Sequence, residues 1–325
     1  MLFIVNDNLN PQFNLALEEY LLRGLKKPAI MLWRNEKSVI LGCNQNASLE
    51  VNEKYALENN IKIARRITGG GAVFHDLGNI NYTIISSNTD DIGRYDSFTS
   101  DLRDFLLTVG IHTTLSGRND ILLNNSKICG NAQAIKDNML IHHGCILFNA
   151  DVSNLSNVLK VNDLKYKYKG IKSVKSRVTN ISEHLYNKIS SSEFLNMFKS
   201  YLISKHNLEI YHLTEYDIKK VNELTENKYS TYEWTFGESP KYNFKNTIKT
   251  NAGVVEINLE IENSIIRKAK IYGDFFNLDD IQTLENQLVG LRHNREKLIK
   301  CVKNVDKYIL NMNDDAFIEL LTNKD

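Results

Sequence analysis

The spacing of apolar residues along this chain switches repeatedly between the period of a helix and that of a strand. Helical spacing runs from Phe13 to Leu25 and returns over Val51–Asn59, Asp96–Val109 and Ser192–Lys205. Short apolar or alternating runs predict strands at Leu2–Val5, Ala29–Arg34, Ser38–Gly42, Ile61–Arg65, Ala72–His75, Asn79–Ser86 and Leu140–Asn149. Interleaved helices and antiparallel-looking strands predict an α+β fold, with a mixed or antiparallel sheet that carries its helices on one side.

A second, smaller unit follows a stretch poor in apolar residues. Thr235–Asn246 contains a glycine and a proline and predicts a linker. Beyond it, 254–261 and 265–272 alternate around a polar turn and predict a hairpin, and 278–291 and 314–321 have helical spacing. We therefore expect two domains, 1–246 and 247–325, the second a small α+β domain without chemical groups clustered for catalysis.

Composition excludes several classes of protein. With 325 residues, 42% of them hydrophobic and 24% charged, the chain can fill a core, so disorder is not expected. The net charge of +1 gives no overall attraction to nucleic acid or to an anionic membrane. The four cysteines form no C-x-x-C pair, which argues against zinc and disulfides, and no window approaches the ~18 apolar residues of a membrane span. The N-terminus has no basic region before its short apolar run, so no signal peptide is expected. These features predict a soluble, cytoplasmic protein.

The stretch with the strongest chemical signal is Arg65–Tyr82. Two arginines precede the glycines Gly69–Gly71, and strands are predicted on both sides of them. Glycines let backbone N–H groups approach a ligand closely, and arginine is a bidentate partner for phosphate or carboxylate. The residues alone leave two interpretations open, an anion-binding cradle and a structural glycine-rich hairpin. The spacing matches neither a P-loop nor a dinucleotide-binding fingerprint.

Three further segments carry candidate groups. Lys127 enters a predicted strand, where it is either solvated or directed into a cleft by alternation with Ile128. His142 and His143 are adjacent on a strand and face opposite ways, so a metal pair is not expected there. The basic run Lys165–Arg177 mixes tyrosines with cations, which is typical of single-stranded nucleic-acid binders, of a solvated loop, or of a loop that closes over a phosphate.

Four motifs, in this order, closely resemble the lipoate–protein ligase family. They are RRITGGGAVFHDLGNINY, GRNDILLNNSKICGNAQ, HHGCILFNAD and GIKSVKSRVTNI, and FNLALEEYLL, LWRN, GCNQN and EWTFGESPKYN fit the same family. The resemblance spans nearly the whole chain, including the small C-terminal domain. It implies a catalytic domain with the fold of biotin and lipoate ligases followed by an accessory domain, and it displaces the nucleic-acid interpretation of the basic run.

The resemblance implies a two-step ligation. Lipoate attacks the α-phosphorus of ATP to give lipoyl-AMP and pyrophosphate, and a lysine of an apo lipoyl domain then attacks the carbonyl and releases AMP. The expected acceptors are 2-oxoacid dehydrogenase E2 subunits, the glycine cleavage H protein, or both. Lys127 matches the lysine that touches the lipoyl carbonyl and the phosphate, where its ammonium would stabilise charge developing in both steps. No nucleic-acid or membrane partner is expected, and the protein is expected to be a monomer.

The resemblance also assigns binding residues. Those that match the ATP- and adenylate-contacting positions are Arg66, Gly71, Ala72, Val73, Phe74, Lys127, Lys172, Ser173, Arg177 and Val178. Gly69, Gly70 and His143, with Lys127, would line the lipoate slot. Asn119 and Asp120 are expected on the side that holds Mg²⁺ and admits the acceptor lysine.

One competing mechanism follows from Cys129. Acyltransferases of the same fold move lipoyl or octanoyl groups between carrier proteins through a catalytic cysteine, which lies just before the strand that leads to the lysine motif. That region, 114–120, has no cysteine in this chain. Cys129 lies two residues after Lys127, so on a regular strand both side chains would share one face. We expect a buried, inert cysteine, because an acyl-thioester route would need no ATP.

Overall fold

The computed structural model describes the chain except for residues 118, 152, 154, 160–177, 237–242 and 323–325. Its larger part is built on an eight-stranded sheet with the order β11-β1-β2-β6-β10-β9-β8-β7. These strands are β1 (Leu2–Val5), β2 (Ala29–Trp33), β6 (Asn79–Ser86), β7 (Thr114–Ser116), β8 (Asp120–Leu123), β9 (Ser126–Lys136), β10 (Met139–Leu147) and β11 (Glu209–His212). Strand β1 is parallel to β2 and β11 whereas the other neighbours are antiparallel, so the predicted mixed sheet is confirmed.

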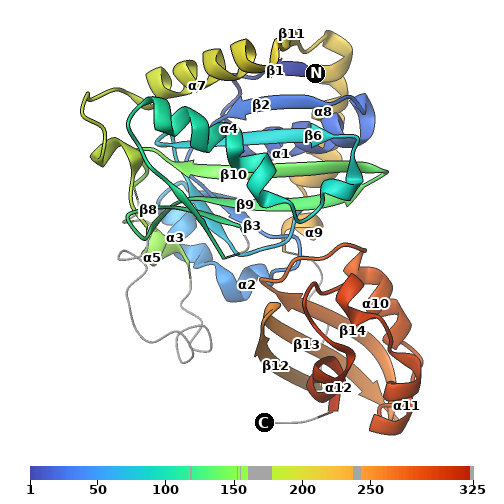
Figure 1. The fold of residues 1–325 in the computed structure, drawn as a ribbon. Coiled ribbons are helices and arrows are strands. Elements are labelled where there is room, and N and C mark those ends of the chain that lie inside the picture. Colours follow the sequence, from blue (N-terminus) through green and yellow to red (C-terminus); the bar gives the residue numbers. More distant parts are fainter. Residues whose placement is uncertain (118, 152, 154, 160–177, 237–242, 323–325) are drawn as a thin grey trace.

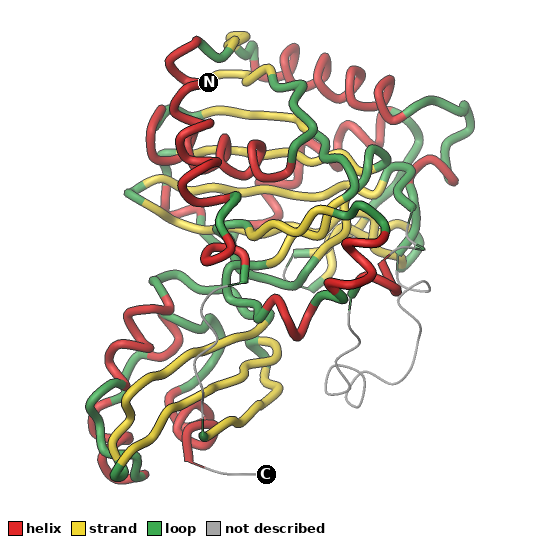
Figure 2. Tube along the Cα trace, turned by 180° about the vertical axis from the view of Figure 1, so that it is seen from behind, coloured by secondary structure: helices red, strands yellow, loops and turns green. Residues whose placement is uncertain are grey.

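Helices cover both faces of this sheet (Figures 1 and 2). Helices α4 (Tyr95–Thr108) and α7 (Ser191–His206) pack on one face, and α1 (Pro11–Tyr20) and α8 (Glu215–Leu224) pack on the other. The expectation of helices on one side is therefore wrong. The reason is visible in β2, where Ile30 and Leu32 enter one core and Met31 and Trp33 enter the other. A strand that is apolar at every position is buried on both faces.

A smaller sheet beside the large one carries the glycine-rich segment. Its order is β4-β3-β5, formed by β3 (Ser38–Leu41), β4 (Lys62–Arg65) and β5 (Val73–His75). Because β3 lies between them, β4 and β5 do not pair, and the glycines join the two outer strands. The hairpin interpretation of this segment is wrong. The nearby short helices are α2 (Ala47–Glu50), α3 (Glu53–Glu58), α5 (Leu155–Val158) and α9 (Tyr232–Thr235).

The C-terminal lobe has its own sheet and core and lies below the larger part in Figure 1. Its elements are β12 (Phe244–Thr250), β13 (Gly253–Glu262), β14 (Ile265–Gly273), α10 (Ile281–Leu288), α11 (Arg295–Cys301) and α12 (Asp314–Thr322). The predicted hairpin is β13–β14. The expected boundary after residue 246 would cut β12, so we propose that the second domain begins before Phe244.

Backbone hydrogen bonds join the two lobes at the glycine-rich segment. The N–H of Gly70 donates to the carbonyl of Phe275 (3.2 Å), and the N–H of Gly273 donates to the carbonyl of Asn44 (2.7 Å). The Asn44 side chain adds a bond to Asn277 (3.0 Å). The amide-rich loop that follows β3 therefore docks the C-terminal lobe, beyond its role as a turn. Within the described part of the chain, no helix combines the length and apolar character needed to span a bilayer.

Candidate functional site

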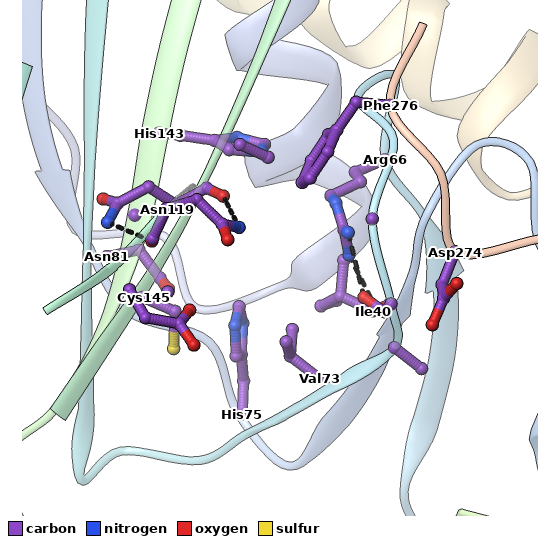
Figure 3. Close-up of a pocket in the computed structure, with 18 of the residues that line it drawn as sticks. Ile40, Arg66, Val73, His75, Asn81, Asn119, His143, Cys145, Asp274 and Phe276 are labelled. Carbon is purple, nitrogen blue, oxygen red and sulfur yellow. Dashed lines mark hydrogen bonds between the residues drawn. The ribbon is translucent and has the colours of Figure 1, made fainter. Parts of the chain in front are cut away.

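A cavity of about 300 Å³ lies between the large sheet, the small sheet and the C-terminal lobe (Figure 3). One wall is the face of the large sheet that also packs on α1. The opposite wall consists of the glycine-rich segment with Ile40 and Val73, and the C-terminal lobe contributes Asp274 and Phe276. Such a volume, with apolar walls and a few convergent polar groups, is typical of a small-molecule site.

Strand register explains which residues of the large sheet reach this cavity. In antiparallel sheets, residues directly opposite one another project from the same face. One such row crosses five strands and contains Trp33, Asn81, Cys145, Gly130 and Asp120. All five line the cavity. The row therefore runs from an apolar aromatic side chain to a carboxylate.

Lys127 reaches the same face because of a β-bulge. Residue Ile121 pairs with Cys129, but Leu122 pairs with Lys127, so Ile128 is an extra residue in β9. The bulge reverses the alternation, and Lys127 and Cys129 project from opposite faces. The expectation that they share one face is wrong. The ammonium of Lys127 lies 2.7 Å from Asp120 Oδ1, and it passes over Gly130, where a Cβ atom would be only 2.5 Å from it.

Cys129 is packed in the core on the far side of the sheet. Its side chain is 0% exposed and lies in the cluster formed with Ile121 and Tyr82. Burial raises the pKa of the Cys129 thiol well above its ordinary value. A thiol nucleophile needs the opposite shift and access to substrate. The structure therefore gives no support to an acyl-thioester mechanism at Cys129.

Two other cysteines lie near the lobe interface and the cavity. Cys145 lines the cavity, and burial raises the pKa of its thiol to about 12. Its sulfur accepts a hydrogen bond from Asn79 Nδ2 (3.3 Å). Burial likewise raises the pKa of Cys43, which lies beside Asn277. Neither environment favours a thiolate at neutral pH.

Arg66 holds the glycine-rich segment in shape. Its guanidinium donates to the carbonyls of Ile40 (3.2 Å), Gly69 (2.7 Å) and Gly71 (2.9 Å) and to the hydroxyl of Thr68 (3.0 Å). Burial lowers the pKa of Arg66 to about 10, so the group is still charged at neutral pH. The positive charge thus lies at the cavity wall, while its donors fix the backbone.

Arg65 does not face the cavity. Its guanidinium donates to backbone carbonyls of the loop after β3 and of α9, namely those of Gly42, Cys43, Gln45, Trp234 and Thr235. Of the two adjacent arginines, only Arg66 belongs to the cavity. Arg66 directly follows β4, and its N–H still donates to the Leu41 carbonyl of β3 (3.0 Å), so neighbouring side chains point to opposite sides here as they do within the strand.

His143 takes part in a chain of hydrogen bonds. Arg66 donates to the hydroxyl of Thr68, that hydroxyl lies 2.8 Å from His143 Nε2, and His143 Nδ1–H donates to Glu18 Oε1 (2.8 Å). Glu18 is 1% exposed and also accepts from Thr83 (2.6 Å). Contacts at both ring nitrogens fix the ring orientation of His143. As expected, His142 faces away, stacked on Phe98 at 4.9 Å between ring centres.

The C-terminal lobe closes the cavity at the first two glycines. A Cβ atom on Gly69 would lie 2.5 Å from the carbonyl oxygen of Phe275, whereas one on Gly71 would meet no atom within 4 Å. Gly70 has φ +94°, which only glycine adopts without strain. The ring of Phe276 lies 3.2 Å from the place of a Cβ on Gly70. Close packing between the lobes thus requires glycine at positions 69 and 70, and the backbone conformation requires it at Gly70 as well.

Most of the residues expected at the site lie together. Those that line the cavity are Arg66, Gly70, Gly71, Ala72, Val73, Asn119, Asp120, Lys127 and His143. Gly69 faces the C-terminal lobe, and Phe74 is buried in the core of the small sheet. Val178 forms a bridge with Lys127 in the backbone ladder. Lys172, Ser173 and Arg177, with the rest of the basic run, lie outside the described residues.

Sequence reasoning missed several cavity residues. Asn81 and Cys145 belong to the row of the sheet next to His143, so the alternation of β6 and β10 would have found them once their pairing was known. His75 ends β5, directly after the residues expected to contact ATP. No sequence signal indicates Asp274 or Phe276, because they come from the other lobe.

Comparison with known proteins agrees with this architecture. Residues 10–203 match the lipoyl protein ligase A/B catalytic domain, and residues 239–321 match the bacterial lipoate protein ligase C-terminus. Lipoate–protein ligase 1 of Staphylococcus aureus is 40% identical over 315 residues, which are 95% of each chain. The structure is similar to that of P. falciparum LipL1 in complex with lipoate, with a TM-score of 0.80, 25% identity and coverage of 98% and 97% of the two chains.

A lipoate–protein ligase A bound with ATP is also similar, with a TM-score of 0.62 and 28% identity, over 73% of this chain and 99% of that one. The family models together cover both lobes, and the sequence and the fold agree on one family. The chain belongs to the lipoate–protein ligases and is an ATP-dependent ligase of that family.

Proposed function

We propose that the cavity between the two lobes binds lipoate and ATP together and that Lys127 serves both half-reactions. The lipoate carboxylate forms a bond to the α-phosphorus of ATP while the bond to the β-phosphate oxygen breaks and pyrophosphate leaves. An acceptor lysine amine then attacks the carbonyl carbon of lipoyl-AMP, and AMP leaves with the electron pair of the broken C–O bond. The observation that carries the proposal is the position of the Lys127 ammonium, held over the cavity by Asp120 opposite the glycine-rich segment.

Electrostatics explain why such a lysine is needed. Two anions must approach each other in the first step, and negative charge develops on the carbonyl oxygen in the second. A cation in a partly buried site stabilises both. Lys127 is 35% exposed, which leaves it reachable by substrate, and Arg66 adds a second positive charge at the wall. The backbone of Gly71–Phe74 would contact the nucleotide, and Gly70 and His143 the acyl chain.

Magnesium would accompany the nucleotide. Among the described residues, no three acidic, histidine or cysteine side chains are arranged to hold a metal ion. This agrees with a Mg²⁺ ion bound mainly by phosphate oxygens and one or two carboxylates. Asp120 supplies a half-exposed carboxylate at the cavity, and Asn119 is anchored beside it by a bond from its Nδ2 to the Asn131 carbonyl (2.6 Å). The ion would neutralise the phosphates and orient them.

The acceptors that we propose are apo lipoyl domains of 2-oxoacid dehydrogenase E2 subunits, the glycine cleavage H protein, or both. The family to which the chain belongs supports this assignment. We also propose that the protein acts as a monomer in the cytoplasm, where the free thiols Cys43, Cys129, Cys145 and Cys301 would stay reduced.

The direct test is ATP-dependent lipoylation of a panel of purified apo acceptor domains, followed by mass spectrometry of the acceptor. We expect the mass of one lipoyl group on acceptors, strictly dependent on ATP, and lipoate-dependent exchange between ATP and pyrophosphate without acceptor. Transfer of a lipoyl or octanoyl group between carrier domains in the absence of ATP would support the acyltransferase instead.

A further inference from the structure

Two side chains of the cavity carry donor nitrogens that no described residue satisfies. Nε2 of His75 and Nδ2 of Asn81 are both buried without a hydrogen-bond partner among the described residues. The two residues are 4% and 2% exposed, and both line the cavity. Buried donors are almost always paired, because an unpaired one loses its bonds to water without compensation. Two of them in one cavity are available to an acceptor atom of a bound ligand.

The tautomer of His75 follows from its neighbours. Asn35 Oδ1 accepts from Asn14 Nδ2 (2.9 Å), so Asn35 Nδ2 is the donor to His75 Nδ1 (3.1 Å). The ring proton is then on Nε2. Burial lowers the pKa of His75 to about 3, which keeps the ring neutral at neutral pH. At its unpaired end His75 can therefore only donate.

Both donors lie between the apolar and the cationic parts of the cavity. Asn81 occupies the row of the sheet between Trp33 and Cys145, and the His75 ring packs edge-on against Trp33, at 6.3 Å between centres. Lys127 crosses the same row two strands further on, over Gly130. Figure 3 shows His75 rising from β5 towards the sheet that carries Asn81 and Cys145. The donors thus lie where an acyl chain would end and phosphate would begin.

We propose that His75 Nε2–H and Asn81 Nδ2–H₂ bind an anionic oxygen at the junction of the substrate carboxylate and the α-phosphate of the nucleotide. This inference rests on the proposed function of the cavity. Carboxylate and phosphate oxygens accept without donating, which suits His75 Nε2–H and the unpaired Nδ2 of Asn81. Hydrogen bonds to a charged acceptor are also stronger than those between neutral groups. The two neutral donors would orient the oxygen while Lys127 supplies the charge.

The test uses His75→Phe and Asn81→Leu in the full-length protein. Each removes one donor at similar volume, and we expect each to lower kcat/KM for lipoate-dependent ATP–pyrophosphate exchange by about 10- to 100-fold. Calorimetric titration of each variant with lipoate alone and with ATP alone separates the two sources of the oxygen. Weaker lipoate binding assigns the carboxylate, weaker ATP binding assigns the phosphate, and a loss in kcat alone assigns an oxygen held in the transition state.

Matched controls come from the other face of the sheet. His142→Phe and Gln133→Leu also remove a buried neutral imidazole and a buried amide, but neither residue lines the cavity, and their exchange kinetics should stay within about 2-fold of the parent. Where Asn81→Leu fails to fold, the isosteric Asn81→Asp, which replaces the donor by an acceptor, tests the same point. Parent-like kinetics and affinities in folded His75→Phe and Asn81 variants would overturn the inference, as would a ligand-bound crystal structure with only water on both nitrogens. Absence of exchange in the parent protein would overturn the proposed function itself.

Discussion

The two faces of the large sheet place neighbouring residues of the same strands in different surroundings. On the cavity face, Lys127 reaches solvent-accessible space, and His143 is tied into a polar chain with Glu18. On the far face, Cys129 and His142 are both 0% exposed in an apolar core. Burial raises the thiol pKa of Cys129 and lowers the imidazole pKa of His142, so both groups are neutral there.

A single extra residue in β9 makes this division possible. Without the bulge at Ile128, the amine and the thiol of one tripeptide would lie on the same face. A reactive thiol beside an ammonium is the arrangement that an acyltransferase needs. The comparison teaches that the chemistry open to a side chain depends on the face to which its strand turns it. Proximity in the sequence alone does not reveal that face.

The sharpest test of the cavity face is Lys127→Met. Methionine keeps most of the side-chain volume but removes the charge that both half-reactions require. We expect a loss of about 10²-fold or more in adenylate formation and in transfer from supplied lipoyl-adenylate. Exchange between ATP and pyrophosphate measures the first, and acceptor mass measures the second. Unimpaired exchange by the variant would remove Lys127 from the first step.

The lobe contact that closes the cavity is tested by Gly69→Ala. The added methyl group would meet the Phe275 carbonyl at 2.5 Å, so the lobes must separate locally. We expect about 10-fold slower adenylation, together with a larger radius of gyration in solution scattering. Gly71→Ala, whose methyl group meets no atom within 4 Å, is the control for the scattering change. Equal scattering by all three proteins would show that the contact tolerates the methyl group.

The burial of His142 on the far face predicts that the stability of the fold depends on pH. The folded pKa of His142 lies well below the ordinary value of 6.5 because of burial, so below about pH 6.5 the unfolded chain binds a proton that the native protein does not. Stability should therefore be fully present above pH 6.5 and fall as the pH is lowered, with a slope that approaches about 1.4 kcal/mol per pH unit for this group. Urea unfolding of the parent and of His142→Phe between pH 7 and 5 measures the difference in slope. Identical slopes would show that the pKa of His142 is the same in the folded and unfolded states.

The smallest effect is expected from Cys129→Ser. The thiol lies on the far face, away from the cavity, so ligation activity should stay within about 2-fold of the parent and should remain ATP-dependent. The measurement is lipoylation of an acceptor domain with and without ATP. Loss of an ATP-independent acyl transfer in this variant would assign the chemistry to the far face and would reverse the comparison.

Several elements of the fold, and the family, could be predicted from the sequence because local patterns of residues determine them. The helices at α1, α4 and α7 follow from their apolar spacing, and the motif around Gly69–Gly71 and Lys127 led to the right family. The hairpin β13–β14 was also predicted, because its turn is local. Helix α11 and strands β11 and β12 were not identified, since their exposed or weakly alternating residues carry little pattern.

What could not be predicted depends on long-range pairing. Predicting helices on both faces requires the knowledge that β2 lies inside the sheet. The placement of β3 between β4 and β5 cannot be predicted from the residues of these strands. The bulge at Ile128 depends on the register of β8. Asp274 and Phe276 join the cavity only through the packing of one lobe against the other.

The bulge also determines which single-residue deletions β9 tolerates. Deleting the single codon for Ile128 would remove the bulge and restore strict alternation in β9, and Lys127 would stay opposite Leu122 on the cavity face. The cost would be the loss of the buried Ile128 side chain, without a change of face for the ammonium. A deletion in the turn at Asn124–Asn125 would instead shorten a connection between two paired strands. A deletion scan across 120–136 should therefore show a milder loss of activity at 128 than at the paired positions of β9, where a deletion turns part of the strand to the other face.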